Sequence, residues 1–338
     1  MDLRSWHGHE EGTVDPSLPR VAAIDIGTNT VKLTIAAREA DGTLHHIADA
    51  AATPRLGSGT RHGRIPLGNM LRTVHVLKEC VELCRRYSVV SVVAVGTAAL
   101  REAKNAQDFL HLTRDIGLPV EVLSGDEEAR LSALAVRSDP RWRDAAPLMV
   151  LDIGGGSTEV IFDSDGRSQS RTSLPIGAVR VSEACFHHDP PLSTEVEQAR
   201  AGIGQAYASV SWPEVRLTAV GVGGTMTNMG AVALAHRGSS ETDALHGTVL
   251  GMQAVRRQIQ LYASIPDAER KRIAGLDPAR SDVILAGALV AEGALEAGNI
   301  EAIAVSCRGL RWGVLYDRFG KSARAIAASE QTNIGRPH

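Results

Sequence analysis

One short pattern occurs twice in the chain. In each copy an apolar run ends in an aspartate, a glycine-rich turn follows, and a second β-branched run begins; the copies are Ala23–Thr30 (AIDIGTNT) and Val150–Ser157 (VLDIGGGS). Such a pattern is typical of a β-hairpin with a tight turn. Glycines and small hydroxyl residues allow backbone N–H groups at the turn to converge on an anion. The chain is therefore predicted to fold as two similar halves, each carrying a phosphate-binding loop.

The residues of these loops are the first candidate site residues. We expect phosphate contacts from Thr28, Asn29 and Thr30 in the first copy, and from Gly154, Gly155, Gly156 and Ser157 in the second. A third glycine turn, Gly223-Gly224-Thr225, follows a predicted strand and opens a helix, where backbone N–H groups also favour an anion. Asp25 and Asp152 end the strands before the two loops, and a carboxylate beside phosphate indicates a divalent cation, Mg²⁺ or alternatively Mn²⁺.

Apolar periodicity predicts the same βββαβαβ order in each half. The first half has strands at 21–26, 31–37, 43–50, 89–95 and 119–123, with helices at 67–87 and 105–116. The second half has strands at 148–153, 159–163, 171–174, 217–222 and 302–305, with helices at 193–209, 248–264, 279–297 and 309–319. The polar ends, residues 1–19 and 321–338, are predicted to be a disordered leader and tail.

Bulk properties narrow the class of protein. With 338 residues the chain is long for one core, so two domains are expected. A net charge of −3 gives no basic excess, which argues against a nucleic-acid partner. No signal peptide or membrane-spanning run is apparent, so we expect a cytoplasmic protein with no membrane partner. The 4 cysteines lack the spacing of a zinc site or a disulfide framework and are expected to be inert thiols.

The duplicated loops in this element order resemble the actin-like ATPase superfamily. That resemblance implies an α/β fold of two actin-like, ribonuclease-H-like ATPase domains facing a central cleft. Three further segments, Gly96–Asn105, Leu123–Leu131 and Asp152–Glu159, resemble the signature of the exopolyphosphatase / guanosine pentaphosphate phosphatase (Ppx/GppA) family in its short two-domain form. The resemblance runs from about residue 20 to residue 319. It implies a first domain over 20–128 plus 314–320, a second domain over 129–313, and a homodimer.

The resemblance also implies roles for individual residues. Glu128 would be the general base and Arg101 would stabilise charge on the scissile phosphoryl group, whereas whether Glu127 shares the role of Glu128 stays open. Asp152 and Glu159 would hold Mg²⁺, with Asp25 as the corresponding carboxylate of the first half. Lys32 takes the repeat position of Glu159 and would bind phosphate.

The implied activity is hydrolysis of the terminal phosphoanhydride of inorganic polyphosphate, with release of orthophosphate. Three alternatives remain: hydrolysis of the 5′ terminal phosphate of guanosine pentaphosphate, a catalytically weak sensor of polyphosphate or guanosine tetraphosphate, and a kinase of the same fold. One segment departs from the family pattern, because Cys307 and Trp312 replace an aspartate and a glutamate in the sequence Ser306–Gly313. Exposed arginines such as Arg55, Arg61, Arg64 and Arg180 could line a polyphosphate path or could simply be solvated.

Overall fold

The computed structural model describes residues 4–8, 14–60, 62–164, 167–236 and 244–320. The chain divides into two compact units. The first unit comprises residues 1–124, 134–143 and 310–338, and the second comprises 125–133 and 144–309. The predicted ranges differ from these units at residues 125–128 and 134–143, because helix α4 (Gly125–Arg137) begins in the second unit and ends in the first. They also differ at residues 310–313, because the last helix begins at Leu310 and belongs to the first unit.

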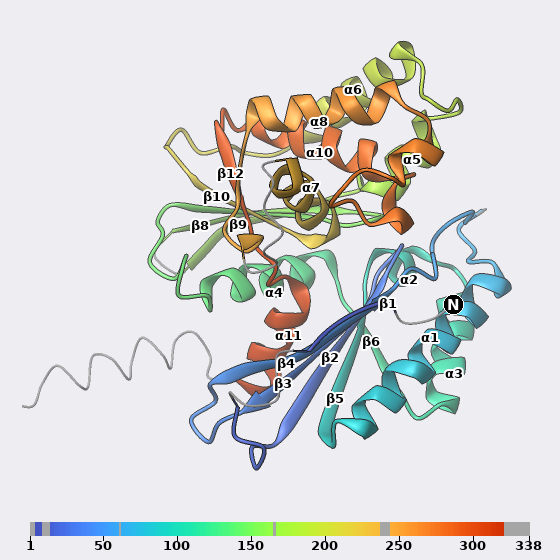
Figure 1. Ribbon diagram of the computed structural model, residues 1–338, viewed down its shortest axis with the longest axis vertical. Helices are drawn as coiled ribbons and strands as arrows, with labels where there is room; N and C mark the ends of the chain where they lie inside the picture. Colours follow the sequence, from blue (N-terminus) through green and yellow to red (C-terminus); the bar gives the residue numbers. More distant parts are fainter. Residues whose placement is uncertain (1–3, 9–13, 61, 165–166, 237–243, 321–338) are drawn as a thin grey trace, which may run out of the picture. The chain divides into compact units, whose positions relative to one another are not determined.

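The first unit is built on a six-stranded sheet of order β1-β4-β3-β2-β5-β6. The strands are β1 (Arg4–Gly8), β2 (Arg20–Ile26), β3 (Val31–Arg38), β4 (Leu44–Ala52), β5 (Val89–Gly96) and β6 (Val120–Val122). The hairpin β2–β3 is antiparallel, whereas β5 runs parallel to β2 and β6 parallel to β5. Helices α1 (Leu67–Arg86) and α3 (Ala106–Asp115) cover one face, and α11 (Leu310–Phe319) covers the other by packing on β2 and β3 (Figure 1). The short helix α2 (Ala98–Glu102) follows β5.

The second unit repeats this plan. Its six-stranded sheet has the order β11-β12-β10-β7-β8-β9, made of β7 (Leu148–Ile153), β8 (Thr158–Ser164), β9 (Arg167–Leu174), β10 (Thr218–Val222), β11 (Val249–Gly251) and β12 (Ala302–Val305). The helices after α4 are α5 (Ala178–Cys185), α6 (Ser193–Tyr207), α7 (Gly223–His236), α8 (Met252–Ser264), α9 (Asp267–Arg270) and α10 (Ile284–Ala297). Helix α10 is apolar on nearly every side and is buried, because α5, α6, α7 and α8 pack around it (Figure 1).

Both βββαβαβ halves are therefore present, and the differences from the predicted elements are local. Residues 4–8 of the predicted disordered leader form β1, which pairs antiparallel with β4 because an edge strand offers unpaired backbone groups to a passing segment. The helix predicted at 279–297 begins instead at Ile284, after a short 3₁₀ turn, η2 (Pro278–Arg280). Residues 249–251 form β11 instead of the start of a helix. The predicted tail 321–338 and leader residues 1–3 and 9–13 lie outside the described residues.

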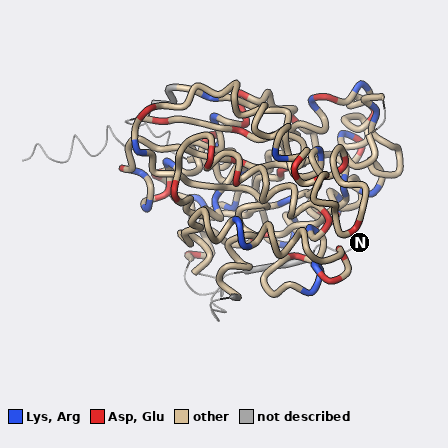
Figure 2. The backbone as a smooth tube through the Cα atoms, turned by 90° about the horizontal axis from the view of Figure 1, so that it is seen from above, with Lys and Arg blue, Asp and Glu red and all other residues tan. Residues whose placement is uncertain are grey.

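The charge pattern is mixed in both units. Figure 2 shows basic and acidic residues interspersed along the backbone, as expected for a net charge of −3. Among the described residues, no helix combines the length and the apolar character that crossing a membrane requires.

Candidate active site

The first loop (Gly27–Thr30) is the turn of the β2–β3 hairpin. Ile26 pairs with Val31, and the N–H of Gly27 donates to the carbonyl of Thr30 at 3.0 Å. The side chains of Thr28, Asn29 and Thr30 are buried. The amide nitrogen Nδ2 of Asn29 is buried without a hydrogen-bond partner among the described residues. Because buried donors are almost always satisfied, this amide fits a bound acceptor such as a phosphate oxygen.

The second loop (Gly154–Ser157) has the same construction between β7 and β8. The N–H of Gly154 donates to the carbonyl of Ser157 at 3.0 Å. A Cβ atom on Gly154 would lie 3.0 Å from that carbonyl oxygen, and one on Gly27 would lie 3.1 Å from the carbonyl oxygen of Thr30. Both turns are thus tight enough to favour glycine at their first position. The predicted duplication of the loop is confirmed at the level of backbone geometry.

Two carboxylates lie side by side next to the second loop. Asp152 and Glu159 are cross-strand partners in β7 and β8, and Asp25 and Lys32 are the equivalent partners in β2 and β3. The predicted equivalence of Lys32 and Glu159 is therefore confirmed by the strand register. The first hairpin pairs a carboxylate with an ammonium group, whereas the second pairs two carboxylates.

Hydrogen bonds fix both carboxylates of the second hairpin. Asp152 Oδ2 accepts from the hydroxyl of Ser132 at 2.6 Å, and Glu159 Oε1 accepts from the hydroxyl of Ser173 at 2.7 Å. Glu159 is fully buried. The pKa of Tyr207 is raised by the burial of its own hydroxyl group and also by the negative charge of Glu159. A carboxylate buried to this extent favours a cation close by.

The donor set fits the implied magnesium ion. Carboxylate oxygens are the ligands that Mg²⁺ prefers, and Mg²⁺ commonly uses one or two of them together with water and substrate phosphate. Within the described residues no group of three or more His, Cys, Asp or Glu side chains is arranged to hold a metal. Asp152 and Glu159, as cross-strand partners, supply two such carboxylates.

The third glycine turn meets Asp152 directly. Gly223 has a φ of +89° at the start of α7, and a Cβ atom there would lie 2.8 Å from Asp152 Oδ1. Only glycine adopts this conformation readily. Thr225 is buried, and a Cβ atom on Gly287 would lie 2.6 Å from its methyl carbon. The structure thus brings the predicted third turn, the carboxylate and the segment around Gly287 together.

Sequence reasoning missed one cation at this turn. The guanidinium of Arg280, from η2, lies against Gly224: a Cβ atom on Gly224 would be 2.2 Å from its Cζ atom. Asp277 caps η2 by accepting from the N–H of Ala279, and its own N–H donates to Asn228 Oδ1 on α7. The contacts of Arg280 with Gly224 and of Asp277 with Asn228 join segments that are distant in sequence, so no local pattern could have indicated them.

The two candidate glutamates on helix α4 have different surroundings. Glu127 accepts from Arg130 through both of its carboxylate oxygens, at 2.7 and 2.8 Å. Glu128 is buried and lies four residues before Ser132, so the two share one face of the helix. Since Ser132 donates to Asp152, this is the face of α4 that meets the second loop's carboxylate.

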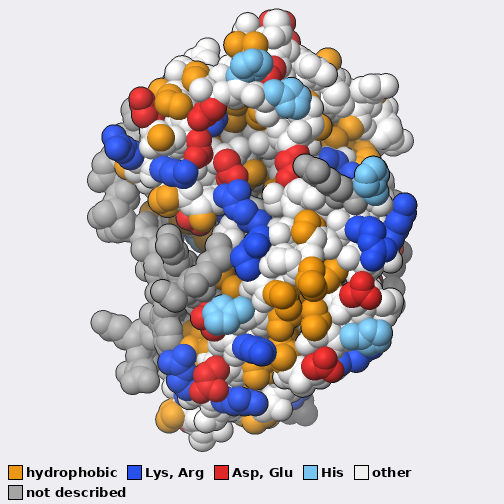
Figure 3. All heavy atoms as spheres, turned by 90° about the vertical axis from the view of Figure 1, so that its right-hand side faces the viewer, with side chains coloured by type: hydrophobic (Ala, Val, Ile, Leu, Met, Phe, Trp, Pro, Cys, Tyr) orange, Lys and Arg blue, Asp and Glu red, His pale blue; other side chains and the backbone are white. Residues whose placement is uncertain are grey.

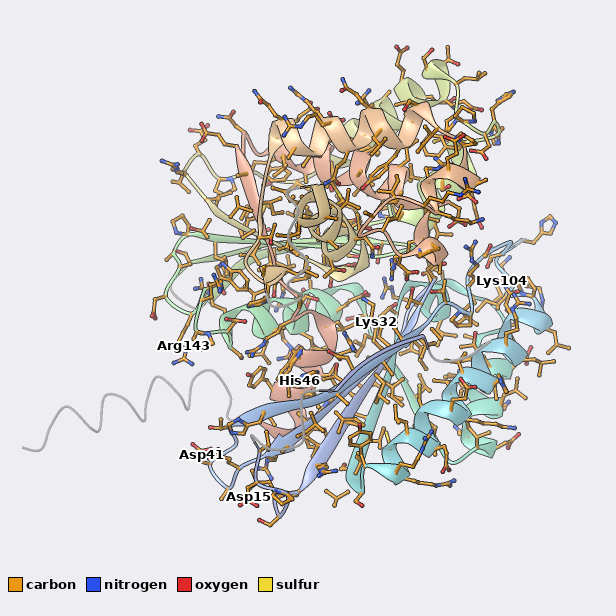
Figure 4. The ribbon with its side chains drawn as sticks, viewed as in Figure 1. Asp15, Lys32, Asp41, His46, Lys104 and Arg143 are labelled. Atoms are coloured by element: carbon orange, nitrogen blue, oxygen red, sulfur yellow. The ribbon has the colours of Figure 1, made fainter. Side chains whose placement is uncertain are left out.

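Arg101 lies beside the first loop. The register pairs Ile26 with Gly96, so β5 ends level with the loop, and α2 follows at once. A guanidinium nitrogen of Arg101 donates to the carbonyl of Leu123 at 3.0 Å. Figure 4 shows Lys32 near the beginning of β3, the strand that leaves the first loop. Arg101 and Lys32 lie in the first unit, whereas Glu128, Asp152, Glu159 and Arg280 lie in the second.

The residues that depart from the family pattern have different environments. Trp312 is buried in the first unit, with its ring 6.1 Å from that of His46 and 5.8 Å from that of Tyr316. Arg311 donates to Asp49 at 2.6 Å; burial alone would raise the pKa of Asp49, but Arg311 and His46 hold it well below its usual range. Trp312 is thus buried beside two other rings, whereas Cys307 is exposed.

Comparisons with known proteins show the family of the chain. The chain matches the profile of the Ppx/GppA phosphatase family over residues 35–322. It is 34% identical to exopolyphosphatase 2 of Mycobacterium tuberculosis over 290 residues, which covers 82% of this chain and 90% of that protein. It is 31% identical to the guanosine-5′-triphosphate,3′-diphosphate pyrophosphatase of Photobacterium profundum over 317 residues, covering 91% of this chain and 61% of that protein.

Solved structures show the same fold. The crystal structure of the Ppx/GppA family member from Aquifex aeolicus superposes with a TM-score of 0.73 at 34% sequence identity, covering 92% of this chain and 99% of that one. The α/β fold with two mixed sheets is therefore confirmed.

Proposed function

Because the chain belongs to the Ppx/GppA phosphatase family, we propose that it is an exopolyphosphatase, which hydrolyses the terminal phosphoanhydride of inorganic polyphosphate and releases orthophosphate. The observation that carries this proposal is the pair of equivalent hairpin loops, one with a lysine and one with a glutamate opposite its aspartate. A phosphate chain needs cationic donors along its length and acidic ligands for the metal at the bond that breaks. The first hairpin supplies Lys32 as a cationic donor, and the second supplies Asp152 and Glu159 as acidic ligands.

The residues divide the reaction between them. Glu128 accepts a proton from the attacking water, because it is a buried carboxylate on the helix face that meets Asp152. The planar guanidinium of Arg101 stabilises charge on the transferring phosphoryl group. Amides of both loops, with Asn29 and Ser157, bind non-bridging oxygens. Bound Mg²⁺, held by Asp152 and Glu159, would neutralise phosphoryl charge.

A second candidate substrate is guanosine pentaphosphate. The relative from Photobacterium profundum is named for an activity on that class of nucleotide, and its terminal phosphoanhydride requires the same catalytic groups. The two substrates differ beyond the terminal phosphates, where polyphosphate continues as a phosphate chain and guanosine pentaphosphate carries a nucleoside.

Phosphate release without an acceptor tests the proposal. The purified chain is incubated with long-chain polyphosphate and, in parallel, with guanosine pentaphosphate, each with Mg²⁺ and with excess chelator. We expect orthophosphate from polyphosphate at the higher kcat/KM, and none in chelator. Faster release from guanosine pentaphosphate would replace the first candidate by the second. Binding without release would instead identify a sensor, and release only with an added acceptor would identify a kinase.

A further inference from the structure

A basic segment runs beside the first loop. We call it the strap; it extends from Arg55 to Ile65, and residue 61 within it lies outside the described residues. The N–H of Arg55 donates to the carbonyl of Asn29 at 3.0 Å, and the N–H of Gly57 donates to the carbonyl of Thr28 at 2.9 Å. A Cβ atom on Gly57 would lie 2.5 Å from the methyl carbon of Thr28. The strap therefore packs directly on the backbone of the first loop.

Asn69 on α1 holds this end of the strap. Its Nδ2 atom lies within hydrogen-bond distance of three strap carbonyls, those of Arg55 (3.0 Å), Leu56 (3.2 Å) and Ser58 (2.7 Å). Arg72 donates to Asn69 Oδ1 at 2.6 Å and fixes the amide orientation. Asn69 is buried, so these bonds are shielded from water.

The far end of the strap is tied to the segment after α2. Asn105 bonds both backbone groups of Ile65: its Oδ1 accepts from the N–H at 2.9 Å, and its Nδ2 donates to the carbonyl at 3.0 Å. The N–H of Lys104 donates to the carbonyl of Gly63 at 2.8 Å. The strap thus runs from the first loop to the residues that follow Arg101, entirely within the first unit.

Two residues of the strap have an unfavourable backbone conformation. Arg55 and His62 have φ values of +59° and +52°, which side-chain-bearing residues rarely adopt. Such residues persist where the surroundings over-determine them, and they cluster at functional sites. In the second unit the N–H of Ala178, at the very start of α5, already bonds the second loop at 3.0 Å. A hairpin loop of this kind can therefore be supported without a strap.

The strap exposes positive charge. Arg64 is exposed, and so is Lys104, which lies outside the strap and whose aliphatic stem lies against Gly63. Neither Arg64 nor Lys104 forms an ion pair within the described part of the chain. Lys104 lies on the right of Figure 4, and Figure 3, which views the molecule from that side, shows lysine and arginine side chains at the surface.

We propose that Arg64 and Lys104 bind the distal phosphates of an inorganic polyphosphate chain that passes the first loop. The proposal rests on the proposed function, and it names the feature that selects a long chain. Guanosine pentaphosphate carries a nucleoside where a polyphosphate chain continues, so it gains less from these cations.

Equilibrium binding tests the site independently of turnover. Long-chain polyphosphate, tripolyphosphate and guanosine pentaphosphate are titrated into the full chain and into the variants Arg64→Ala and Lys104→Ala at several salt concentrations. Lys78→Ala, which removes an exposed lysine on α1, is the matched control. We expect both Arg64→Ala and Lys104→Ala to weaken binding of the long chain several-fold more than binding of tripolyphosphate. The slope of log K against log salt should fall by about one unit for each cation removed, as for other chains of phosphate charges.

The outcomes separate this inference from the proposed function. An equal loss for all three ligands would place the cations at the terminal phosphate and overturn the inference, as would a loss matched by Lys78→Ala or no loss at all. A selective loss for the long chain supports the site even if the protein releases no phosphate, a result that would overturn only the proposed activity. If Arg64→Ala and Lys104→Ala both release phosphate and their binding depends on chain length as in the wild type, this inference is overturned and the proposed activity stands.

Discussion

Two adjacent glutamates at the start of α4 differ in what they contact. Glu127 is engaged by Arg130 within the same helix, whereas Glu128 shares a face with Ser132, the donor to Asp152. A carboxylate already held by a bidentate guanidinium is a weak base, because protonation would break that pair. These contacts therefore favour Glu128 over Glu127 as the general base. The sequence left open whether the two residues share this role.

We expect Glu128→Gln to lower kcat by roughly 10²–10⁴-fold, the usual cost of losing a general base, with KM changed little. Glu127→Gln should leave kcat within a few-fold of the wild-type value, because Arg130 already engages the carboxylate of Glu127. Steady-state phosphate release measures both. If Glu127→Gln were the inactive variant, the roles assigned to the two side chains would be reversed.

The backbone conformation at position 223 and the nearby carboxylate of Asp152 both favour glycine there. Alanine there would adopt a φ of +89° and place Cβ 2.8 Å from Asp152 Oδ1. We expect Gly223→Ala to cost about 1–3 kcal/mol of stability and to raise the Mg²⁺ concentration for half-maximal rate, since Asp152 must move.

Gly204 provides the matched control. It lies in α6, and an added Cβ atom there meets nothing within 4 Å. Gly204→Ala should gain up to about 1 kcal/mol and leave the metal requirement unchanged. Denaturant titration and metal titration of both variants distinguish these results. A Gly223→Ala protein with wild-type metal dependence would show that Asp152 is not held by the third turn.

At the scale of single elements, the sequence predicted most where local chemistry decides the structure. Both hairpins follow from glycine turns between β-branched strands, and α1 follows from buried residues at helical spacing. Helix α2 has five residues, too few for a periodic pattern to reveal. The strap could not be predicted, because its shape depends on Asn69 and Asn105, which reach it from other elements.

The N-terminus of α6 depends on a single carboxylate. Glu195 accepts from the ring of His188 and from the N–H groups of His187 and Leu192, and these bonds lower its pKa from 4.5 to about 2. The depressed pKa means that the ionised carboxylate stabilises the folded state fully above pH 4.5 and that this stabilisation is lost as the pH falls toward 2.

Glu195→Gln should therefore be less stable than the wild type at pH 7, and the difference should shrink steadily as the pH is lowered below 4.5. Glu197→Gln, an exposed change on the same helix, should show no such dependence. Urea unfolding of the three proteins across this pH range provides the measurement. A stability difference that is constant with pH would show that Glu195 acts through its shape and not through its charge.

At the scale of the whole molecule, the two units have separate hydrophobic cores. The first core includes Phe109 and both Cys80 and Cys84, whereas the second includes Leu289, with Cys185 packed against it. Burial raises the pKa of Cys80 to about 12 and that of Cys84 to about 11, so both thiols are unreactive until the first core opens. The inert behaviour expected of these two cysteines follows from their positions.

Cysteine reactivity can therefore report on each core separately. Phe109→Ala should destabilise the first unit by about 3–5 kcal/mol and bring alkylation of Cys80 and Cys84 to lower denaturant concentrations, because it leaves a cavity in their core. Leu289→Ala, at a cost of about 2–5 kcal/mol, should do the same for Cys185 and leave the first pair unchanged. Cys307, which is exposed, serves as the internal reference in peptide-level mass spectrometry. If either substitution shifted both sets of cysteines equally, the units would unfold as one cooperative block, and coupling between them would outweigh the separation of their cores.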